Sequence, residues 1–303
     1  MGKSKGPHSA NLTVRLTVPS DVEPLSKIAF TAARSIHKQH GVPFFLPTPE
    51  DTKALIQLLM DDPSMYGIVA GLDGRIVGCA FLHEKDEIKS ISGIVIEPKF
   101  QGRGVGKKMV ELLIERANCR SIRMAFAETF NLPYFNVLAG FGFRPHETIS
   151  IVSGIPKGTF DGLLEVRPMV LSDVDACDEL HYETQGFSRR NEMIKCLDPI
   201  YAARPYVALQ SGELVAYTCS FSYHGHTIAK DLTALKQLYI AVAGIMSHAG
   251  ATPRIAIFGR LYPMLLAWAL REAGLKLERN TNLMVLGQYK PPQTHMYIPS
   301  SDY

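Results

Sequence analysis

The stretch Ile91–Lys108 reads ISGIVIEPKFQGRGVGKK. Its first six residues are rich in Ile and have the length of a strand, which Glu97-Pro98 ends because proline has no N–H to donate. Three glycines follow at positions 102, 104 and 106, and a helix is predicted from Lys107 to about Arg116. A strand, a glycine-rich turn and a helix start direct backbone N–H groups and the helix dipole at one anion, usually a phosphate. The sequence therefore predicts a site for a phosphorylated cofactor.

The spacing of these glycines excludes two common phosphate loops. A Walker A loop needs a glycine five positions before Gly106, where this chain has Gln101. The dinucleotide fingerprint G-x-G-x-x-G, started from Gly102 or Gly104, meets a lysine or a methionine at its third glycine. The pattern that remains, Q-x-x-G-x-G directly after a strand, resembles the pyrophosphate loop of the GNAT superfamily of acyl-CoA-dependent N-acyltransferases.

A second motif downstream supports the resemblance. A strand is predicted over Ser121–Ala127 and a helix over 132–139, and Gly142 follows Asn131 by eleven residues. GNAT domains carry an Asn, an apolar helix and a Gly-Phe turn at this spacing, and here Gly142 is followed by Phe143. The resemblance implies that Asn131 touches the cofactor. A second role, which does not exclude the first, is that of an N-cap for the helix.

The resemblance also implies which cofactor is used and how it is held. Acetyl-CoA or another short acyl-CoA is the expected co-substrate, and no metal is expected. In this family the backbone of the strand before the loop binds the pantetheine arm, and the loop binds the pyrophosphate. The residues implied as cofactor-binding are Ile94, Val95, Ile96, Gln101, Gly102, Arg103, Gly104, Val105, Gly106, Lys107 and Asn131. An amine then attacks the thioester carbonyl directly, and fixed N–H donors stabilise the oxyanion.

The catalytic positions of the family are filled differently in this chain. Many members have a general-acid Tyr seven residues after the Asn, where this chain has Leu138. Tyr134 lies one turn earlier on about the same helix face and is the expected substitute, unless it only packs at the helix start. Some members have a Glu base where this chain has Ser90, so Glu84, at a strand end, is the expected base. The alternative proton acceptors are His83, Glu97, Glu128 and a chain of waters.

Three sequence patterns occur twice in the same order, which indicates an internal repeat. Their offsets are 152, 138 and 132 residues. The matched segments are Val14–Val22 with Val166–Val174, Val69–Val77 with Val207–Val215, and Gly142-Phe143 with Gly274-Leu275. Each copy begins with a short strand and an amphipathic helix and continues with a hairpin. In the first copy, Ser20 and Glu23 are expected to form a capping box.

The predicted fold class is mixed α/β, with two tandem GNAT-like domains that each have a mostly antiparallel central sheet flanked by helices. Residues 13–155 are expected to form the acyl-CoA-binding domain, and residues 163–303 the second domain. Residues 1–12 are expected to be a disordered tail. The segment Gly154–Gly162 has the glycine and proline content of a linker between the domains.

The second copy lacks the residues that would bind a phosphate. An extended stretch over 226–232 leads to a helix, and Thr233–Gln237 contains no glycine. Eleven positions before Gly274 stands Pro263 instead of an Asn. We therefore expect a degenerate domain that shapes the acceptor site, forms a dimer contact or only packs. A remaining alternative is that it binds a CoA-like group by another route.

Composition and charge argue against several other classes. The net charge is +3 and 20% of the residues are charged, without the basic stripe of a nucleic-acid-binding protein. No apolar run reaches the about eighteen residues of a membrane span. Five scattered cysteines without a C-x-x-C pair indicate reduced thiols and a cytoplasmic protein. His224 and His226 have no third ligand at useful spacing, so we expect a turn there and no metal pair.

Two functions of different classes fit these patterns. The first is an N-acetyltransferase that transfers an acetyl or short acyl group from CoA to an amine. The second is a non-catalytic CoA-binding sensor or scaffold, which Leu138 and Ser90 favour. Decarboxylation or O-acylation on the same fold is a third option, which needs no different cofactor. Peptides, small amines and amino acids all stay open as acceptors, as does a homodimer. The apolar loop Phe44–Leu46 is either a lid over the acceptor or a loop packed into the core.

Overall fold

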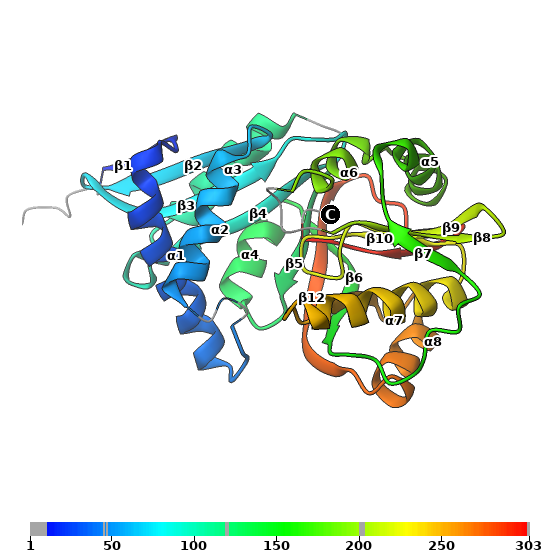
Figure 1. Cartoon of the computed structure of the whole chain (residues 1–303). Helices are drawn as coiled ribbons and strands as arrows, with labels where there is room; N and C mark the ends of the chain where they lie inside the picture. Colours follow the sequence, from blue (N-terminus) through cyan, green and yellow to red (C-terminus); the bar gives the residue numbers. More distant parts are fainter. Residues whose placement is uncertain (1–10, 45, 47, 119–120, 200–203, 302–303) are drawn as a thin grey trace, which may run out of the picture. The chain divides into compact units, whose positions relative to one another are not determined.

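The computed structural model describes residues 11–44, 46, 48–118, 121–199 and 204–301. The chain forms two compact units (Figure 1). The first comprises residues 1–83 and 91–118, and the second comprises residues 84–90 and 119–303. Strand β4 (Lys89–Ile96) contains residues of both units. No described helix has both the length and the apolar character that crossing a membrane requires.

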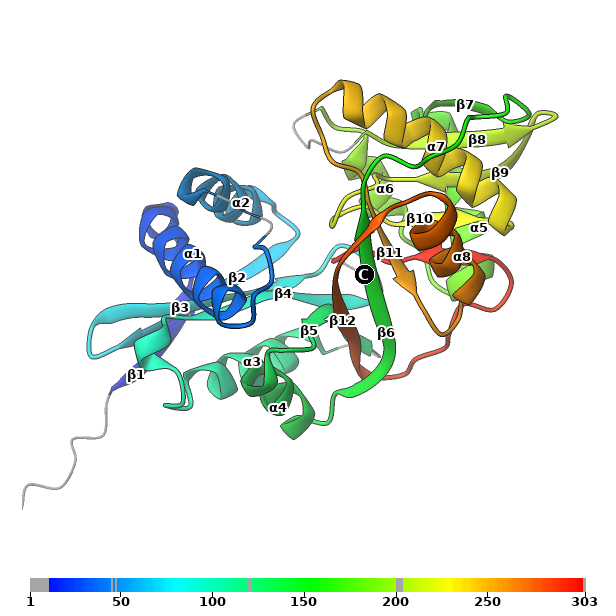
Figure 2. The same ribbon diagram turned by 90° about the horizontal axis from the view of Figure 1, so that it is seen from below.

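The first unit is a sheet with helices on both faces. Its strands follow one another in the order β1 (Leu12–Leu16), β2 (Met65–Leu72), β3 (Arg75–His83) and β4. Its helices are α1 (Val22–Gln39), α2 (Pro49–Asp61) and α3 (Val105–Ala117). Figure 2 shows α1 and α2 on one face of these strands and α3 on the other. Apolar side chains of α1, α2, β2 and β3 form the core between the helices and the sheet.

The start of the chain differs from two sequence expectations. Strand β1 begins at Leu12, which pairs with Leu72, so residue 12 belongs to the sheet; residues 1–10 of the expected tail lie outside the described residues. The expected capping box of Ser20 and Glu23 is wrong. The segment Pro19–Asp21 forms a 3-10 turn before α1 begins at Val22. The carboxylate of Glu23 therefore binds Lys27 and Lys53 instead of capping the helix.

The second unit contains two sheets. The first has the strand order β5 (Ser121–Glu128), β12 (Lys276–Gly287), β6 (Arg144–Ser153) and β11 (Arg254–Phe258), all antiparallel to their neighbours. Helix α4 (Leu132–Gly140) connects β5 to β6. The first residues of β4 pair in parallel with β5, Lys89 with Ile122 and Ser90 with Arg123. Mostly antiparallel sheets flanked by helices confirm the predicted fold class.

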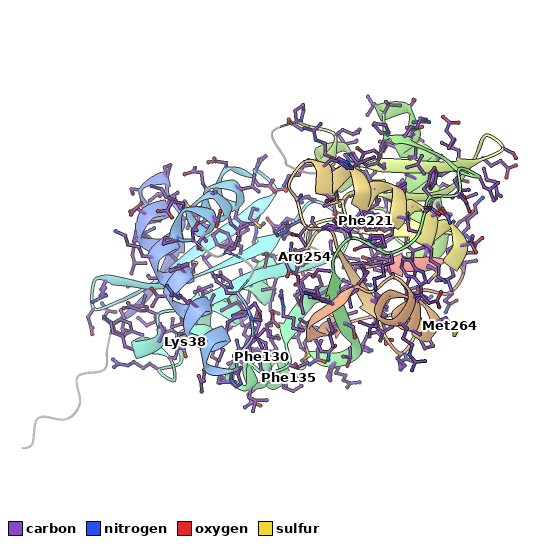
Figure 3. The ribbon with its side chains drawn as sticks, turned by 60° about the horizontal axis from the view of Figure 1, so that its bottom comes forward. Lys38, Phe130, Phe135, Phe221, Arg254 and Met264 are labelled. Atoms are coloured by element: carbon purple, nitrogen blue, oxygen red, sulfur yellow. The ribbon has the colours of Figure 1, made fainter. Side chains whose placement is uncertain are left out.

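The second sheet of this unit has five short strands. They lie in the order β13 (Met296–Ile298), β10 (Thr227–Ala229), β9 (Glu213–Thr218), β8 (Tyr206–Gln210) and β7 (Glu165–Pro168). The helices of this part are α5 (Val174–Gln185), α6 (Arg190–Cys196), α7 (Leu232–His248) and α8 (Pro263–Ala267), which continues into a π-helical turn. Figure 1 shows α5 and α7 on opposite faces of these strands. Arg254, at the start of β11, donates its backbone N–H to the carbonyl of Phe221 at 2.8 Å. Figure 3 labels both residues.

Matching local contacts confirm the internal repeat. Arg15 and Asp21 form a bidentate ion pair with hydrogen bonds of 2.6 and 2.8 Å, and Arg167 and Asp173 form the same pair with 2.7 and 2.8 Å. The hairpin turns also match. The first residue of each turn pair, Asp73 or Ser211, has a positive φ (51° and 53°), as does the glycine that follows. The repeat is therefore present in the backbone and in its side-chain contacts.

The two repeats share their last strands. Strand β6 follows Gly142-Phe143 and β12 follows Gly274-Leu275, and the two strands pair antiparallel. β12, from the second repeat, lies between β5 and β6 of the first, and β6 lies between β12 and β11 of the second. Neither repeat therefore completes this sheet without a strand of the other. The sequence division into 13–155 and 163–303 stays a prediction about chain segments.

The predicted linker is held by hydrogen bonds to the second repeat. The carbonyl of Gly154 accepts from the Tyr239 hydroxyl at 3.0 Å, and the N–H of Lys157 donates to the carbonyl of Ala273 at 2.8 Å. The N–H of Asp161 donates to the Gln237 side chain at 3.1 Å. The composition of the segment thus predicts irregular backbone correctly, while its position is set by these contacts.

Candidate functional site

The glycine loop lies between the end of β4 and the start of α3. The N–H of Glu97 donates to the carbonyl of Val77 on β3 at 2.8 Å, which fixes the end of β4. The side-chain amide of Gln101 donates to the carbonyl of Ile96 at 3.0 Å and closes the turn. Gly102 and Gly104 have φ of +75° and +80°, a region that favours glycine. Gln101 therefore has a structural role in shaping this loop.

The start of α3 is open to a ligand. Its N-cap is Gly104, no side chain caps the helix, and its first turn contains no acidic residue. A Cβ atom added to Gly102 or Gly104 would meet no atom within 4 Å, so the space in front of these residues is free. The first N–H groups of a helix lack intrahelical partners and carry the positive end of the dipole. The loop and the helix start can therefore bind an anion.

Basic residues surround this opening. Arg103 and Lys107 are exposed within the loop and the first turn. The ring of Phe100 is covered by cations, with Arg103 at 5.3 Å from its centroid, Lys99 at 5.3 Å and Arg75 at 5.6 Å. A phosphate at the helix start would therefore meet positive side chains as well as backbone N–H groups.

The strand before the loop is accessible along the residues expected to bind the cofactor arm. Ile94, Val95 and Ile96 are only half-buried although all three are aliphatic. Gly93, immediately before them, has a φ of +67°, which sequence reasoning missed because it read the run as regular strand. On the adjacent strand, a Cβ at Gly78 would come within 2.5 Å of the Val95 carbonyl, so a glycine is required for this close approach.

The equivalent helix start in the second repeat is closed. The N–H of Lys230 donates to the carbonyl of Val215 at 2.8 Å, as Glu97 does to Val77, so α7 is the counterpart of α3. The N-cap of α7 is Asp231, whose carboxylate accepts from the N–H of Ala234 at 2.8 Å. A negative side chain therefore occupies the place where a phosphate would bind. This carboxylate adds a reason, beyond the missing glycines, to expect a degenerate second copy, which stays a prediction.

Asn131 serves as a helix cap. Its side-chain oxygen accepts from the N–H of Tyr134 at 3.3 Å at the start of α4. Its contact with a cofactor stays a prediction. The Tyr134 side chain is half-buried, and its hydroxyl oxygen is buried without a partner among the described residues. Burial raises the pKa of Tyr134 well above its usual value, so the phenol keeps its proton. Leu138 is completely buried, which leaves Tyr134 as the hydroxyl on this helix face.

The expected bases differ in their surroundings. Glu84 is half-buried, and its backbone carbonyl accepts from Lys89 at 2.9 Å. Ser90 is buried, with its hydroxyl 3.4 Å from the carbonyl of Ser301. Glu97 binds Arg75 at 3.2 Å and Lys99 at 2.9 Å. None of these contacts selects Glu84 as the base.

Glu128, at the end of β5, has the most altered acidity of these candidates. Burial raises the pKa of its carboxyl to about 7, and the ion pair with Arg279 opposes this shift only in part. Arg279 lies on β12, with its Nε 2.8 Å from Glu128 Oε1. A carboxyl that titrates near neutral pH is suited to accept and return a proton. Its sequence signal, a lone Glu after a strand, is too common to have singled it out.

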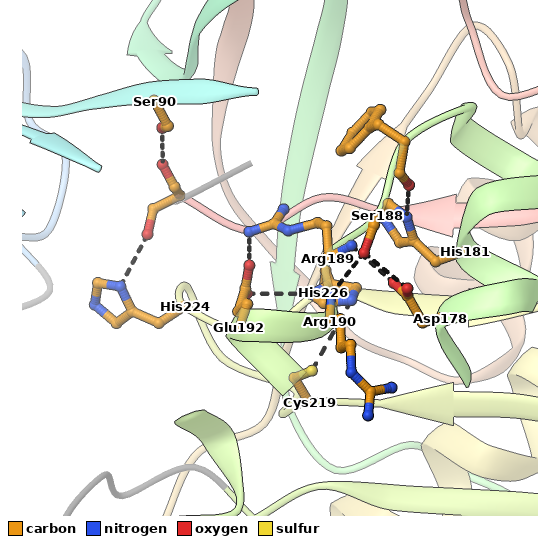
Figure 4. Close-up of polar contacts among 12 residues, drawn as sticks. Ser90, Asp178, His181, Ser188, Arg189, Arg190, Glu192, Cys219, His224 and His226 are labelled. Carbon is orange, nitrogen blue, oxygen red and sulfur yellow. Dashed lines mark hydrogen bonds and ion pairs between the residues drawn. The ribbon is translucent and has the colours of Figure 1, made fainter. Parts of the chain in front are cut away.

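The two histidines His224 and His226 belong to separate hydrogen-bond groups (Figure 4). His226 is fully buried; its Nδ1 lies 3.1 Å from Glu192 Oε1 and its Nε2 lies 2.9 Å from the Tyr217 hydroxyl. His224 Nδ1 lies 2.9 Å from the Ser301 hydroxyl. No group of three or more potential metal ligands occurs in the part of the chain that the structure describes.

Part of the apolar loop after α1 lies against that helix. The ring of Phe44 is 5.0 Å from that of His37 and 6.4 Å from that of Phe30, measured between centroids. Phe44 thus packs on its own unit. Phe45, in the same predicted loop, lies outside the described residues.

Comparison with known proteins agrees with this site. Residues 32–143 match the acetyltransferase (GNAT) family. This part of the chain is therefore similar to GNAT acetyltransferases. The match includes the whole glycine loop, and it ends at Phe143, before the shared strand β6. A search of curated proteins finds no significant match.

Solved structures with the same fold cover nearly the whole chain. A putative acetyltransferase from Pyrococcus horikoshii has 15% identity and a TM-score of 0.72 over 100% of this chain and 98% of that one. A GCN5-related N-acetyltransferase from Sphaerobacter thermophilus has 14% identity and a TM-score of 0.63 over 94% and 98%. A tandem GNAT protein from the clavulanic acid biosynthesis pathway has 12% identity and a TM-score of 0.59 over 92% and 100%. These likenesses confirm the tandem GNAT-like fold.

Proposed function

We propose that this protein is an acyl-CoA-dependent N-acetyltransferase, which transfers an acetyl or short acyl group to an amine by direct attack. The observation that carries the proposal is the open start of α3. Two positive-φ glycines leave free space in front of backbone N–H groups, and the surrounding exposed side chains are basic. The GNAT match over residues 32–143 supports acetyl-CoA as the ligand of this loop.

The residues present fit a CoA pyrophosphate. The backbone of Gly102–Lys107 would bind it, with Arg103 and Lys107 as counter-charges. The backbone of Ile94–Ile96 would hold the pantetheine arm, and Asn131 would contact the cofactor beside its capping role. Bound acetyl-CoA supplies the acetyl thioester. The acceptor is an amine, and the cytoplasmic location and the absence of a metal requirement are proposed on the sequence alone.

The chain's own groups would move the protons of the reaction. Tyr134 keeps its proton at neutral pH and is the proposed general acid toward the leaving thiolate. Glu84 was expected from its position at a strand end. Glu128 is better supported as the base, because its pKa of about 7 lets it accept a proton under physiological conditions.

The alternative function is a CoA-binding sensor or scaffold without turnover. Leu138 and Ser90 support it, because both occupy common catalytic positions of the family and both are buried. A single set of experiments separates the two functions. Turnover with any amine establishes the enzyme, whereas stoichiometric acetyl-CoA binding without turnover establishes the sensor.

The first experiment is a calorimetric titration with acetyl-CoA. We expect one site per chain in the wild type and no binding in Gly104→Glu, because the new carboxylate would occupy and repel the pyrophosphate site. Gly250→Glu is the matched control: Gly250 has a similar φ of +76° and equally free space, but it lies after α7. Two sites per chain would contradict the prediction that the second repeat has lost its cofactor site. Unchanged affinity in a folded Gly104→Glu variant would overturn the loop assignment.

A further inference from the structure

Two ion pairs connect the repeats, and their residues occupy equivalent positions in the two repeats. At the offset of 132 residues, Arg260 corresponds to Glu128 and Arg279 corresponds to Glu147. Glu128 binds Arg279, with Oε1 2.8 Å from Nε, and Arg260 binds Glu147, with Nε 3.1 Å from Oε2. Each pair thus joins the end of one repeat's strand to the shared strand of the other. The charges are reversed, because the carboxylate of one pair occupies the position at which the other pair has its guanidinium.

The two carboxylates differ in how completely they are bonded. Arg260 donates to both oxygens of Glu147. Arg279 pairs with Oε1 of Glu128, and Oε2 is buried with no hydrogen-bond partner in the described structure. A buried polar atom without a partner is costly and calls for an explanation. A ligand with an N–H or O–H donor would satisfy this oxygen.

A second unpartnered oxygen lies opposite Glu128. Thr281 of β12 is the ladder partner of Glu128, so the two side chains project from the same face of the sheet. Thr281 is fully buried, and its Oγ1 likewise has no partner among the residues that are described. The repeat-related position is occupied by Ile149, which is apolar. The two unpartnered oxygens therefore occur beside the end of β5, in the first repeat, and not at the equivalent position of the second repeat.

Arg279 cannot easily turn to satisfy the free oxygen, because other groups hold it. Its Nη1 donates to the Tyr223 hydroxyl at 2.9 Å, and its guanidinium carbon lies 4.8 Å from the centroid of that ring. The Tyr223 hydroxyl in turn donates to Glu278 Oε2 at 2.5 Å. Glu278 is also bound by Arg254, with Nε 3.0 Å from Oε1. Among the described residues of this cluster, Glu128 Oε2 and Thr281 Oγ1 are the buried oxygens without a hydrogen-bond partner.

We propose that Glu128 and Thr281 bind the primary amino group of the acyl acceptor, with Arg279 as a positioning residue that holds the Glu128 carboxylate. The proposal rests on the proposed acetyltransferase function and names the group that the site recognises. An amino group has N–H donors for two acceptor oxygens, which is what the two free atoms require. The second repeat, through β12, thereby completes the acceptor site of the first.

The reaction balances with Glu128 as the proton acceptor. An ammonium bound at Glu128 gives one proton to the carboxylate and becomes a neutral amine with a free electron pair. The positive charge of Arg279 favours this neutral form. The nitrogen then attacks the acetyl carbonyl, the C–N bond forms and the C–S bond breaks. The thiolate of CoA takes up the proton that the nitrogen loses on becoming an amide.

The test measures thiol release from acetyl-CoA with five primary amines: tyramine, spermidine, glucosamine, glycine amide and a lysine-containing tripeptide. We expect at least one acceptor. For that acceptor, Glu128→Gln should lower kcat/KM by about 100-fold or more. Thr281→Val should raise the KM for the amine by about 5-fold, as the loss of one hydrogen bond implies, and Thr281→Ser should restore it. The Kd for acetyl-CoA should stay within about 2-fold in all three variants, whose folding is checked by thermal unfolding.

Arg279→Lys distinguishes positioning from a structural role. Lysine keeps the charge but cannot reproduce the bonds to both Glu128 and Tyr223. We expect the pH at which kcat/KM rises to shift, while a merely structural residue would change only the thermal stability. Glu147→Gln is the matched control, because it alters the repeat-related carboxylate, and it should leave kcat/KM within about 2-fold.

Failure of the subsite and failure of the proposed function give different results. Full activity in folded Glu128→Gln and Thr281→Val overturns the subsite and leaves the acetyltransferase standing. Equal losses in Glu128→Gln and Glu147→Gln overturn it as well. If the wild type acetylates none of the five amines, the same amines are titrated into the CoA-loaded protein, and absence of binding overturns the subsite. Absence of acetyl-CoA binding would instead overturn the proposed function.

Discussion

Helices α3 and α7 begin at equivalent points of the two repeats. The start of α3 is free to bind a negative charge, whereas the start of α7 already contains one. The N-cap of α3 is Gly104, with free space where its side chain would be, whereas the N-cap of α7 is Asp231, which bonds its own helix. A capping carboxylate stabilises a helix by about 1 kcal/mol, and a glycine at that position leaves the N–H groups for a ligand. The same fold can therefore use the start of this helix either to bind a ligand or to stabilise the helix with a capping side chain.

A second comparison concerns the ends of β5 and β11. The first repeat has Glu128 there and the second has Arg260, and each is neutralised by the shared strand of the other repeat. An arginine stays protonated at physiological pH and cannot serve as a base, so Arg260 agrees with the closed cofactor site of the second repeat. The repeats have thus diverged at both the proposed cofactor position and the proposed catalytic position.

Truncation after residue 155 should have the largest effect on this comparison. Without the second repeat, strands β5 and β6 lose β12, which lies between them, and β6 also loses its other ladder partner, β11. We expect the fragment to show no cooperative thermal unfolding by circular dichroism. A fragment 1–155 that unfolds cooperatively would show that the first repeat is an independent domain.

The next largest effect is expected at the open helix start. Gly104→Glu should abolish acetyl-CoA binding in calorimetry, whereas Gly250→Glu should bind like the wild type. Loss of binding in both variants would indicate that backbone strain, which the two positions share, is the cause instead of charge.

Glu128 should make the unfolding free energy of the protein depend on pH. Its pKa in the folded protein, about 7, lies above the ordinary value of 4.5, so the folded state holds this proton more tightly than the unfolded state. The stability from this group is therefore full below pH 4.5 and falls as the pH rises to about 7. At about 1.4 kcal/mol per pKa unit, the loss is of the order of 3 kcal/mol. Chemical unfolding at pH 5 and pH 8 should show a smaller difference for Glu128→Gln than for the wild type; equal differences would contradict the shift.

The smallest effect is expected at the closed helix start. Asp231→Ala should cost about 1 kcal/mol of unfolding free energy in urea, because one N–H loses its acceptor. It should not create acetyl-CoA binding, since no glycine loop precedes α7. A second calorimetric site in Asp231→Ala would mean that the carboxylate by itself closed the site.

Local patterns predicted much of the fold and of the cofactor loop. The Q-x-x-G-x-G motif after an Ile-rich run predicted the loop and α3, because glycine spacing and strand composition act over a few neighbouring residues. The repeat predicted two similar halves, and matching ion pairs at Arg15 and Arg167 confirm it. Predictions that depend on the surroundings of a side chain were less specific. Glu84 and Glu128 look alike as strand-end carboxylates in the sequence, and only burial beside Arg279 distinguishes them.

By itself, the sequence determined the glycine loop before α3, the mixed α/β class, the internal repeat and the absence of such a loop before α7. Each of these depends on residue types at short spacing. The tertiary structure alone decided that β6 and β12 are exchanged between the repeats and that Glu128 faces Thr281 and Arg279. Such contacts join residues about 150 positions apart, 128 and 279 for example. Strand pairing and burial establish them, and neither leaves a periodic signal in the local sequence.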